Sequence, residues 1–135
     1  PGQNMSNLRQ GMVSIFLSQA VSLNSITVRG SLKRFRDFIY IDDVVECWLK
    51  GIELENLRNL TINIGSGKRT EVRFLVDEIC SHFKNIDINV KDSTQGDQFG
   101  IYSDNKLMKD LFQIKKTTSL QAGIKKFVTW AKNSK

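Results

Sequence analysis

Segments in which apolar residues recur at helical spacing alternate with short strand-like segments along this 135-residue chain. The helical segments are residues 8–23, 44–52, 72–83, 107–112 and 120–131. The strand-like segments are residues 25–28, 38–41, 60–64 and 86–90. No repeat, low-complexity tract or linker interrupts the series. This pattern predicts a mixed α/β fold of helices and short strands, forming one domain over residues 1–135.

Polar residues ahead of the helical segments predict where the helices begin. Asp42 or Asp43 is expected to cap the second helix, Thr70 the third and Ser119 the last. Each helix should bury its apolar side. For the second helix, this inner face is expected to consist of Val44, Val45, Trp48, Leu49 and Ile52.

The composition is that of an ordinary globular domain, with 40% hydrophobic and 25% charged residues, so the chain can bury a core. The longest apolar run is far short of the ~20 residues of a membrane span, and no segment resembles a targeting sequence. Cys47 and Cys80 lie in separate helical segments, and His82 is the only histidine. We therefore expect no disulfide, metal site or His-based triad, no membrane partner, and a cytoplasmic location.

The net charge of +6 leaves nucleic acid, a membrane surface or a small phosphorylated ligand as possible partners. One basic cluster, Arg29, Lys33, Arg34 and Arg36, interleaves with apolar residues on predicted strands and favours a functional interpretation. Most aromatic residues fall on predicted buried helix faces. This distribution argues against a nucleic-acid-binding module, because single-strand binders use exposed aromatic platforms.

The turn Gly65-Ser66-Gly67 follows a predicted strand and precedes a helix, as the start of a dinucleotide fingerprint would. The third glycine of that fingerprint is replaced by Thr70, and no acidic residue ends a strand about twenty residues later. A P-loop is excluded because Arg69 follows Lys68. We interpret the turn as a tight strand-to-helix connection and predict no NAD site in this chain.

Arg36 is the strongest binding candidate on residue type and position. Its guanidinium can grip a phosphate with paired N–H donors, and a strand edge beside a helix start is a suitable place for it. A surface salt bridge to Asp42 or Asp43 is an equally good explanation. From the residues alone, both alternatives stay open.

Several motifs in collinear order resemble one known family. They are Pro1-Gly2-Gln3, the run from Arg36 to Val45, the segment from Asn63 to Gly67, and the run from Ser119 to Ile124. Together they resemble the C-terminal, substrate-binding part of the extended short-chain dehydrogenase/reductase enzymes, which are NAD-dependent nucleotide-sugar epimerases and dehydratases with a Rossmann-type fold. UDP-glucose 4-epimerase-like members look closest.

The resemblance implies that the NAD-binding part and the catalytic Tyr/Lys pair precede this chain, which by itself carries no catalytic residue. Tyr102 and Lys106 have the YxxxK spacing of such a pair. We interpret this spacing as coincidence, because the family's pair lies upstream. The longer parent is expected to be a homodimer, and this chain alone to be monomeric.

The resemblance also implies which residues line a UDP-sugar. Gly11 and Met12 would face the diphosphate with Arg36, while Thr27 and Arg29 would line the nucleobase. Lys68 would border the nucleotide. Thr94 stands where the family usually has a second phosphate-binding arginine, and Ile101 would approach carbon 2 of the sugar. The predicted substrate-binding set is Gly11, Met12, Thr27, Arg29, Arg36, Lys68, Thr94 and Ile101.

Three alternatives remain beside the epimerase or dehydratase interpretation. The first is a UDP-sugar decarboxylase or reductase of the same family, because those enzymes share the same segments. The second is the basic nucleic-acid-binding module. The third is an interaction domain that kept the fold without catalysis.

Overall fold

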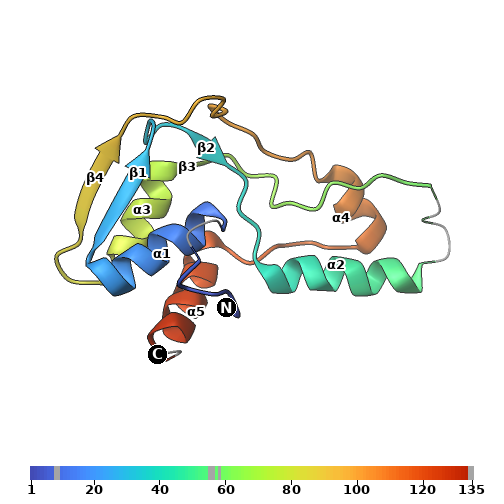
Figure 1. The fold of residues 1–135 in the computed structure, drawn as a ribbon. Coiled ribbons are helices and arrows are strands. Elements are labelled where there is room, and N and C mark those ends of the chain that lie inside the picture. The colour runs from blue at the N-terminus through green and yellow to red at the C-terminus, as the bar shows by residue number, and fades with distance from the viewer. Residues whose placement is uncertain (8–9, 55–56, 58, 134–135) are drawn as a thin grey trace.

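The computed structural model describes residues 1–7, 10–54, 57 and 59–133, and its helices and strands alternate as predicted (Figure 1). The helices are α1 (Met12–Leu23), α2 (Ile41–Glu53), α3 (Val72–Cys80), α4 (Lys106–Phe112) and α5 (Leu120–Asn133). The strands are β1 (Ser25–Arg29), β2 (Phe35–Arg36), β3 (Thr70–Glu71) and β4 (Asp87–Lys91). The mixed α/β prediction is therefore confirmed.

In the main body, α1 packs against β1 of a small parallel sheet made of β1 and β4, and α3 and α5 pack against α1 and against each other (Figure 1). The sheet pairs Ile26 with Ile88 and Val28 with Val90. Only the β1 residues of these pairs are buried, because α1 packs against β1 while every residue of β4 is exposed. The principal core is made of Phe16, Leu17, Ala20, Ile26, Val28, Val72, Leu75, Val76, Ile79, Ile124, Phe127, Val128 and Ala131.

A second small sheet pairs β2 with β3 in antiparallel orientation, matching Phe35 with Glu71 and Arg36 with Thr70. The strand predicted at 38–41 is wrong, since the chain leaves β2 after Arg36 and Ile41 already begins α2. The segment Phe38-Ile39-Tyr40-Ile41 is a short continuous apolar run, and Phe38 packs against the principal core. The run therefore reflects packing without strand pairing.

The predicted helix caps are confirmed only in part. Ser119 accepts a hydrogen bond from the Ala122 N–H at 3.2 Å, as predicted. Thr70 lies in β3, and Asp42 and Asp43 lie inside the first turn of α2, so none of these three is a cap. The first predicted helix begins at Met12, and Leu8 lies outside the described residues.

The two outer helices, α2 and α4, lie apart from the main body and enclose a smaller cluster (Figure 1). Cys47 is the buried residue of α2, and it packs with Met108, Phe112 and Ile114. The predicted inner face of α2 is wrong. Val45, Trp48, Leu49 and Ile52 are all exposed, because the contact with α4 uses the other side of the helix.

The predicted strand at 60–64 is also wrong, because no other described strand lies beside it. Both cysteines are free thiols, as expected. Among the described residues, no helix is long and apolar enough to cross a membrane.

The first prediction tests the principal core. Leu75 is fully buried, while its neighbour Phe74 on the same helix is 46% exposed. We expect Leu75→Ala to lower the free energy of unfolding by ~2–5 kcal/mol, because it leaves a cavity among packed side chains. Phe74→Ala, the matched control, should cost clearly less. Urea unfolding followed by circular dichroism measures both, and equal losses would contradict the assigned core.

Candidate functional site

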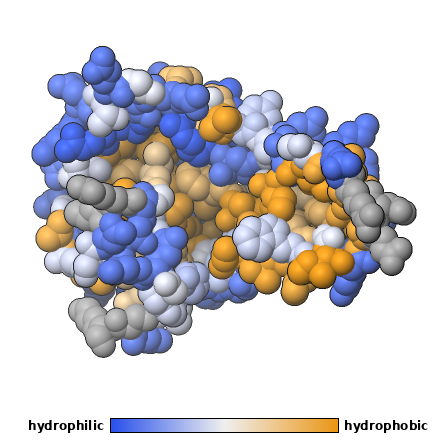
Figure 2. Space-filling model, turned by 45° about the vertical axis from the view of Figure 1, so that its right-hand side comes forward, coloured by the Kyte–Doolittle hydropathy of each residue, from blue (hydrophilic) through white to orange (hydrophobic). Residues whose placement is uncertain are grey.

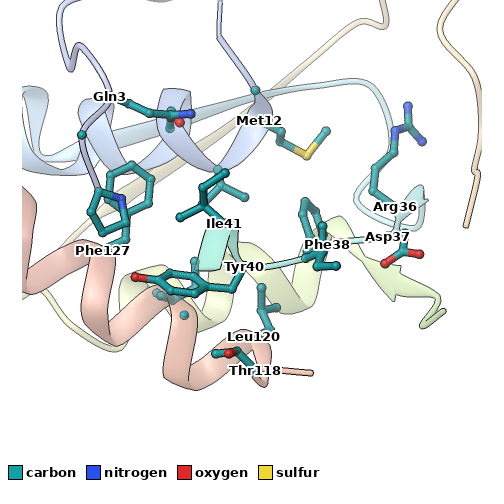
Figure 3. A pocket seen from close by; sticks show the side chains of 18 residues that line it. Gln3, Met12, Arg36, Asp37, Phe38, Tyr40, Ile41, Thr118, Leu120 and Phe127 are labelled. Carbon is teal, nitrogen blue, oxygen red and sulfur yellow. The ribbon is translucent and has the colours of Figure 1, made fainter. Parts of the chain in front are cut away.

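An open pocket of about 820 Å³ lies between the start of α1, the segment that joins β2 to α2, and the start of α5. Arg36 and Asp37 lie at one end of this pocket, and Phe127 lies toward the other (Figure 3). Its walls are largely apolar. Labelled residues that line it are Gln3, Met12, Arg36, Asp37, Phe38, Tyr40, Ile41, Thr118, Leu120 and Phe127.

Arg36 is held by the loop that follows β4. Its guanidinium donates to the Gln98 carbonyl at 2.9 Å and to the Phe35 carbonyl at 2.8 Å, and it pairs with the Asp97 carboxylate at 3.3 Å. The alternative left open by the sequence, a salt bridge of Arg36 to Asp42 or Asp43, is not formed, because Arg36 pairs with Asp97. These contacts already order the Arg36 guanidinium, which lowers the conformational entropy cost of binding a ligand there.

Asp97 is shared by two arginines. Arg34 is buried and binds the other Asp97 oxygen, and it also donates to the carbonyls of Arg29 and Ser31. Burial, and secondly the nearby charge of Arg36, lower the pKa of the Arg34 guanidinium. Two cations against one carboxylate leave this corner with a net positive charge, which favours an anion near Arg36.

Asp37, next to Arg36, ties three distant segments together. Its carboxylate accepts hydrogen bonds from the N–H groups of Ser66, Gly67 and Ser103 at 2.9, 3.0 and 3.1 Å. It also accepts from both serine hydroxyls. Partial burial alone would raise the pKa of Asp37. The hydrogen bonds from Ser103, Ser66 and Gly67 outweigh that effect and hold the pKa below its ordinary value.

The Gly-Ser-Gly turn is built for this contact. A side chain at Gly65 would collide with the Ser103 hydroxyl, and Gly67 has a φ of +70° with Asn105 only 2.8 Å from any added Cβ. Asn105 in turn donates to the Gly65 carbonyl at 2.9 Å. A phosphate would need the backbone donors of this turn, but Asp37 already occupies them. The described residues therefore do not fit NAD here.

The structure brings three of the predicted binding residues to one pocket. Gly11, Met12 and Arg36 line it together. Gly11 is the N-cap residue of α1, and among the described residues no side chain caps this helix or places a negative charge in its first turn. The free N–H groups of a helix start attract anions, so this end of α1 complements Arg36.

The other predicted residues lie outside the pocket. Thr27 and Arg29 are on β1, where the Thr27 N–H is already bonded to the Gln19 side chain at 2.9 Å. Lys68, Thr94 and Ile101 are exposed in loops, and Ile101 is 57% exposed. A ligand that reached them would extend from the pocket across the molecule's surface.

Sequence reasoning missed Asp37 and the binding role of Asp97. The signal available for Asp37 was an acidic residue between Phe35 and Phe38, followed later in the chain by two separate serine-containing segments. Asp97 was recognised only as part of a motif with Thr94. Its pairing with Arg34 and Arg36 joins residues more than sixty positions apart, which no local pattern reveals.

The N-terminal half of the chain, residues 1–65, matches the sequence model of the "NAD dependent epimerase/dehydratase family". The chain belongs to this family. A curated relative from Methanocaldococcus jannaschii, named "Putative UDP-glucose 4-epimerase", is 35% identical over 127 residues, which cover 92% of this chain and 40% of the relative. The chain therefore spans less than half the length of this relative.

Solved structures of low sequence identity share the fold. Pal from Bacillus thuringiensis aligns over 100% of this chain and 43% of its own, with a TM-score of 0.89 and 20% identity. UDP-glucuronic acid 4-epimerase from Bacillus cereus, solved with UDP-glucuronic acid and NAD, aligns over 93% of this chain and 41% of its own, with a TM-score of 0.81 and 22% identity. NAD is the cofactor of this family.

The second prediction concerns Asp37. We expect Asp37→Asn to lower the free energy of unfolding at pH 7 by ~1.5–3 kcal/mol, because the charged acceptor of several hydrogen bonds is lost. Asp42→Asn, at a carboxylate whose side chain is 70% exposed, should change it by less than ~0.5 kcal/mol.

The pH dependence of the same variant gives a second readout. Because folding lowers the pKa of Asp37, its contribution is complete above the ordinary value of ~3.9 and disappears as the pH falls through the folded value. The difference between the parent and Asp37→Asn should therefore shrink below about pH 4. Urea unfolding at several pH values measures it. A difference that stayed constant into strong acid would refute the assigned role.

Proposed function

We propose that this chain is the nucleotide-sugar-binding part of an NAD-dependent sugar epimerase of the UDP-glucose 4-epimerase kind. The observation that carries the proposal is the convergence of Arg36 and the uncapped start of α1 on one pocket of about 820 Å³. A guanidinium and free helix N–H groups are both donors for a diphosphate. The family membership supplies the substrate class.

The charge arrangement supports a diphosphate at this corner. Arg34 already neutralises much of the Asp97 charge, so Arg36 keeps positive charge available for a ligand. A bound phosphate would replace weak acceptors, such as the carbonyl of Gln98, with charged oxygens. Such charge-assisted hydrogen bonds are roughly twice as strong as neutral ones.

In the proposed enzyme, NAD bound outside this chain supplies the hydride chemistry at the sugar. The residues described here bind and orient the nucleotide sugar and shield one side of it from water. Thr94 provides one uncharged donor where the family usually places an arginine, so Lys68 or Arg29 is proposed to supply the missing positive charge. The longer protein is proposed to be a homodimer.

The third prediction tests the Arg36 contact in the intact protein, which joins residues 1–135 to their nucleotide-binding part. Arg36→Ala should weaken UDP-sugar binding about 10- to 100-fold, the equivalent of ~1.5–3 kcal/mol for a lost charge-assisted phosphate contact. Arg73→Ala removes an exposed cation from α3 and serves as the control. Isothermal titration with a UDP-sugar measures both. Equal affinities for the parent and a folded Arg36→Ala protein would reject the role.

The fourth prediction concerns sugar choice. Ile101 is exposed and smaller than tyrosine, and we propose that it leaves room for an N-acetyl group on the sugar. We expect both UDP-glucose and UDP-N-acetylglucosamine to be turned over, with no exclusive preference, because hydrophobic pockets that differ by a few carbons discriminate by only ~1–3 kcal/mol. Ile101→Tyr should shift the ratio toward UDP-glucose. Steady-state kinetics of the intact protein measure both substrates, and an unchanged ratio would contradict the assignment.

A further inference from the structure

Strand β4 has an open edge. It pairs with β1 on one side, and among the described strands none lies on its other side. All five of its residues are exposed. In Figure 1, β4 lies at the left of the molecule and α2 at the right. Figure 2 shows that apolar side chains gather over the half that carries α2, beside a hollow, so a contact made by β4 would leave that surface and the pocket free.

The opposite edge of the same sheet is closed. Helix α1 packs along β1, and the Thr27 N–H of β1 donates to the Gln19 side chain of α1 at 2.9 Å. A side chain that takes up a backbone donor in this way blocks the approach of another strand. Within the part of the chain that the structure describes, β4 is therefore the edge of this sheet that can accept a further strand.

The backbone of β4 directs two of its residues outward. The Asp87 N–H donates to the residue before β1 at 3.2 Å, and the Lys91 carbonyl accepts from the residue after β1 at 2.8 Å. Successive residues of a strand direct their backbone groups to alternate sides, so Asn89 also faces β1. The N–H and C=O groups of Ile88 and Val90 therefore point to the open edge, where no other described segment pairs with them.

The side chains at this edge are incompletely covered. Ile88 and Val90 are 46% and 55% exposed, although their partners in β1, Ile26 and Val28, are fully buried. Paired residues of neighbouring strands lie on the same face of a sheet. Ile88 and Val90 thus extend the apolar face of the principal core to the open edge. A strand that carried apolar residues at the same spacing would cover them.

The sequence of β4 complements itself when one copy is reversed. It reads Asp87-Ile88-Asn89-Val90-Lys91. With Asn89 opposite its own copy in an antiparallel pair, Asp87 lies opposite Lys91 and Ile88 lies opposite Val90. Within the described residues, neither Asp87 nor Lys91 forms an ion pair. Opposite charges and apolar side chains directly across from each other stabilise a strand pair, whereas like charges destabilise it.

The backbone and the side chains require the same register. When Asn89 faces its copy, Ile88 and Val90 of the two chains stand opposite each other and exchange N–H···O=C hydrogen bonds. A shift by two residues keeps the outward backbone groups opposed but places Lys91 opposite Asn89, which removes the charge pairs. The register centred on Asn89 therefore satisfies both conditions.

We propose that β4 is an edge through which two copies of this chain associate. The two β4 strands pair antiparallel about a two-fold axis at Asn89, and they form one continuous sheet of order β1-β4-β4-β1. A two-fold interface needs one patch that complements itself, and β4 supplies both halves. The contact does not depend on the proposed function. It departs from the expectation that residues 1–135 alone are monomeric, and its small area makes it a weak association.

A cysteine at the axis tests the arrangement in the intact protein. Residues opposite each other at a non-hydrogen-bonded position have Cα atoms ~4.5 Å apart, which a disulfide can span. Asn89→Cys should therefore form a covalent dimer under mild oxidation with copper phenanthroline. Asp92→Cys is the matched control, since Asp92 is also exposed but its two copies would lie ~20 Å apart. Non-reducing gels should show roughly fivefold or more covalent dimer for Asn89→Cys. The parent, with Cys47 and Cys80, gives the background.

A charge cycle tests the register in the Asn89→Cys protein. Lys91→Asp places two carboxylates opposite each other, and Asp87→Lys places two ammonium groups opposite each other. Each should lower the yield of covalent dimer roughly three- to tenfold. The double substitution, which exchanges the two charges, should restore the yield.

A backbone substitution in the same protein tests strand pairing. Val90→Pro removes an N–H that faces the open edge and leaves the pairing with β1 intact, so the variant should fold but lose the covalent dimer. Val90→Thr keeps the N–H and the branched shape and should retain the covalent dimer. Circular dichroism of each variant checks that the fold is kept.

Each outcome decides the proposal. Equal yields for Asn89→Cys and Asp92→Cys, or no covalent dimer above the parent's background, would overturn it. A charge exchange that failed to restore the yield would also overturn it, because the strands would then meet in another register or not at all. If Val90→Pro unfolded the protein, the charge cycle would still decide, since it leaves every backbone donor in place.

Discussion

The Asp37 carboxylate is the contact on which the arrangement of this chain depends. It joins the segment after β2 to the Gly-Ser-Gly turn and to the segment ahead of α4, through hydrogen bonds with Ser66, Gly67 and Ser103. Of these segments, the one after β2 contacts the principal core through Phe38. A second carboxylate, that of Asp43 in α2, accepts hydrogen bonds from the N–H and hydroxyl of Thr118, ahead of α5, at 2.8 and 2.9 Å. The two carboxylates together tie the outer helices to the main body.

The position of Arg36, the candidate binding residue, depends on that contact. Arg36 precedes Asp37 in the chain, so fixing the carboxylate also fixes where the guanidinium begins. Asp97 then orients it from the other side and shares its charge with the buried Arg34. The result is a cation that is ordered before any ligand arrives. Preorganised donors of this kind lose little entropy on binding.

The two halves of the molecule differ in how completely the apolar side chains of their helices are buried. Around β1, α3 and α5, side chains such as Leu17 and Ile79 are fully buried. Around α2, burial stops at Cys47 and the opposite side of the helix stays uncovered. A 13-residue helix gains little stability from its own hydrogen bonds. Packing on the Cys47 side therefore holds α2 in place, while its apolar side stays exposed among the described residues.

Local sequence patterns were sufficient to predict the structure of a segment wherever that segment interacts with its own neighbours in the chain or with one core. The apolar period of α3 and α5, the Ser119 cap and the α/β order were all readable from spacing, because these features repeat every two or about four residues. Arg36 could be selected as a binding residue because its type and position fit an anion. The family resemblance came from collinear motifs and held for the fold.

Only the tertiary structure decided which groups meet. The apolar run at 38–41 and the alternation at 60–64 predicted strands, but pairing needs a second strand that a local pattern does not supply. The apolar stripe of α2 could be recognised from the sequence, but whether it is buried could not. Amphipathicity shows which side of a helix is apolar and does not show what covers that side. The pairing of Arg36 with Asp97 and the hydrogen bonds of Asp37 connect residues far apart in the chain. The sequence determined which residues were able to bind, and the folded path of the backbone determined what each of them binds.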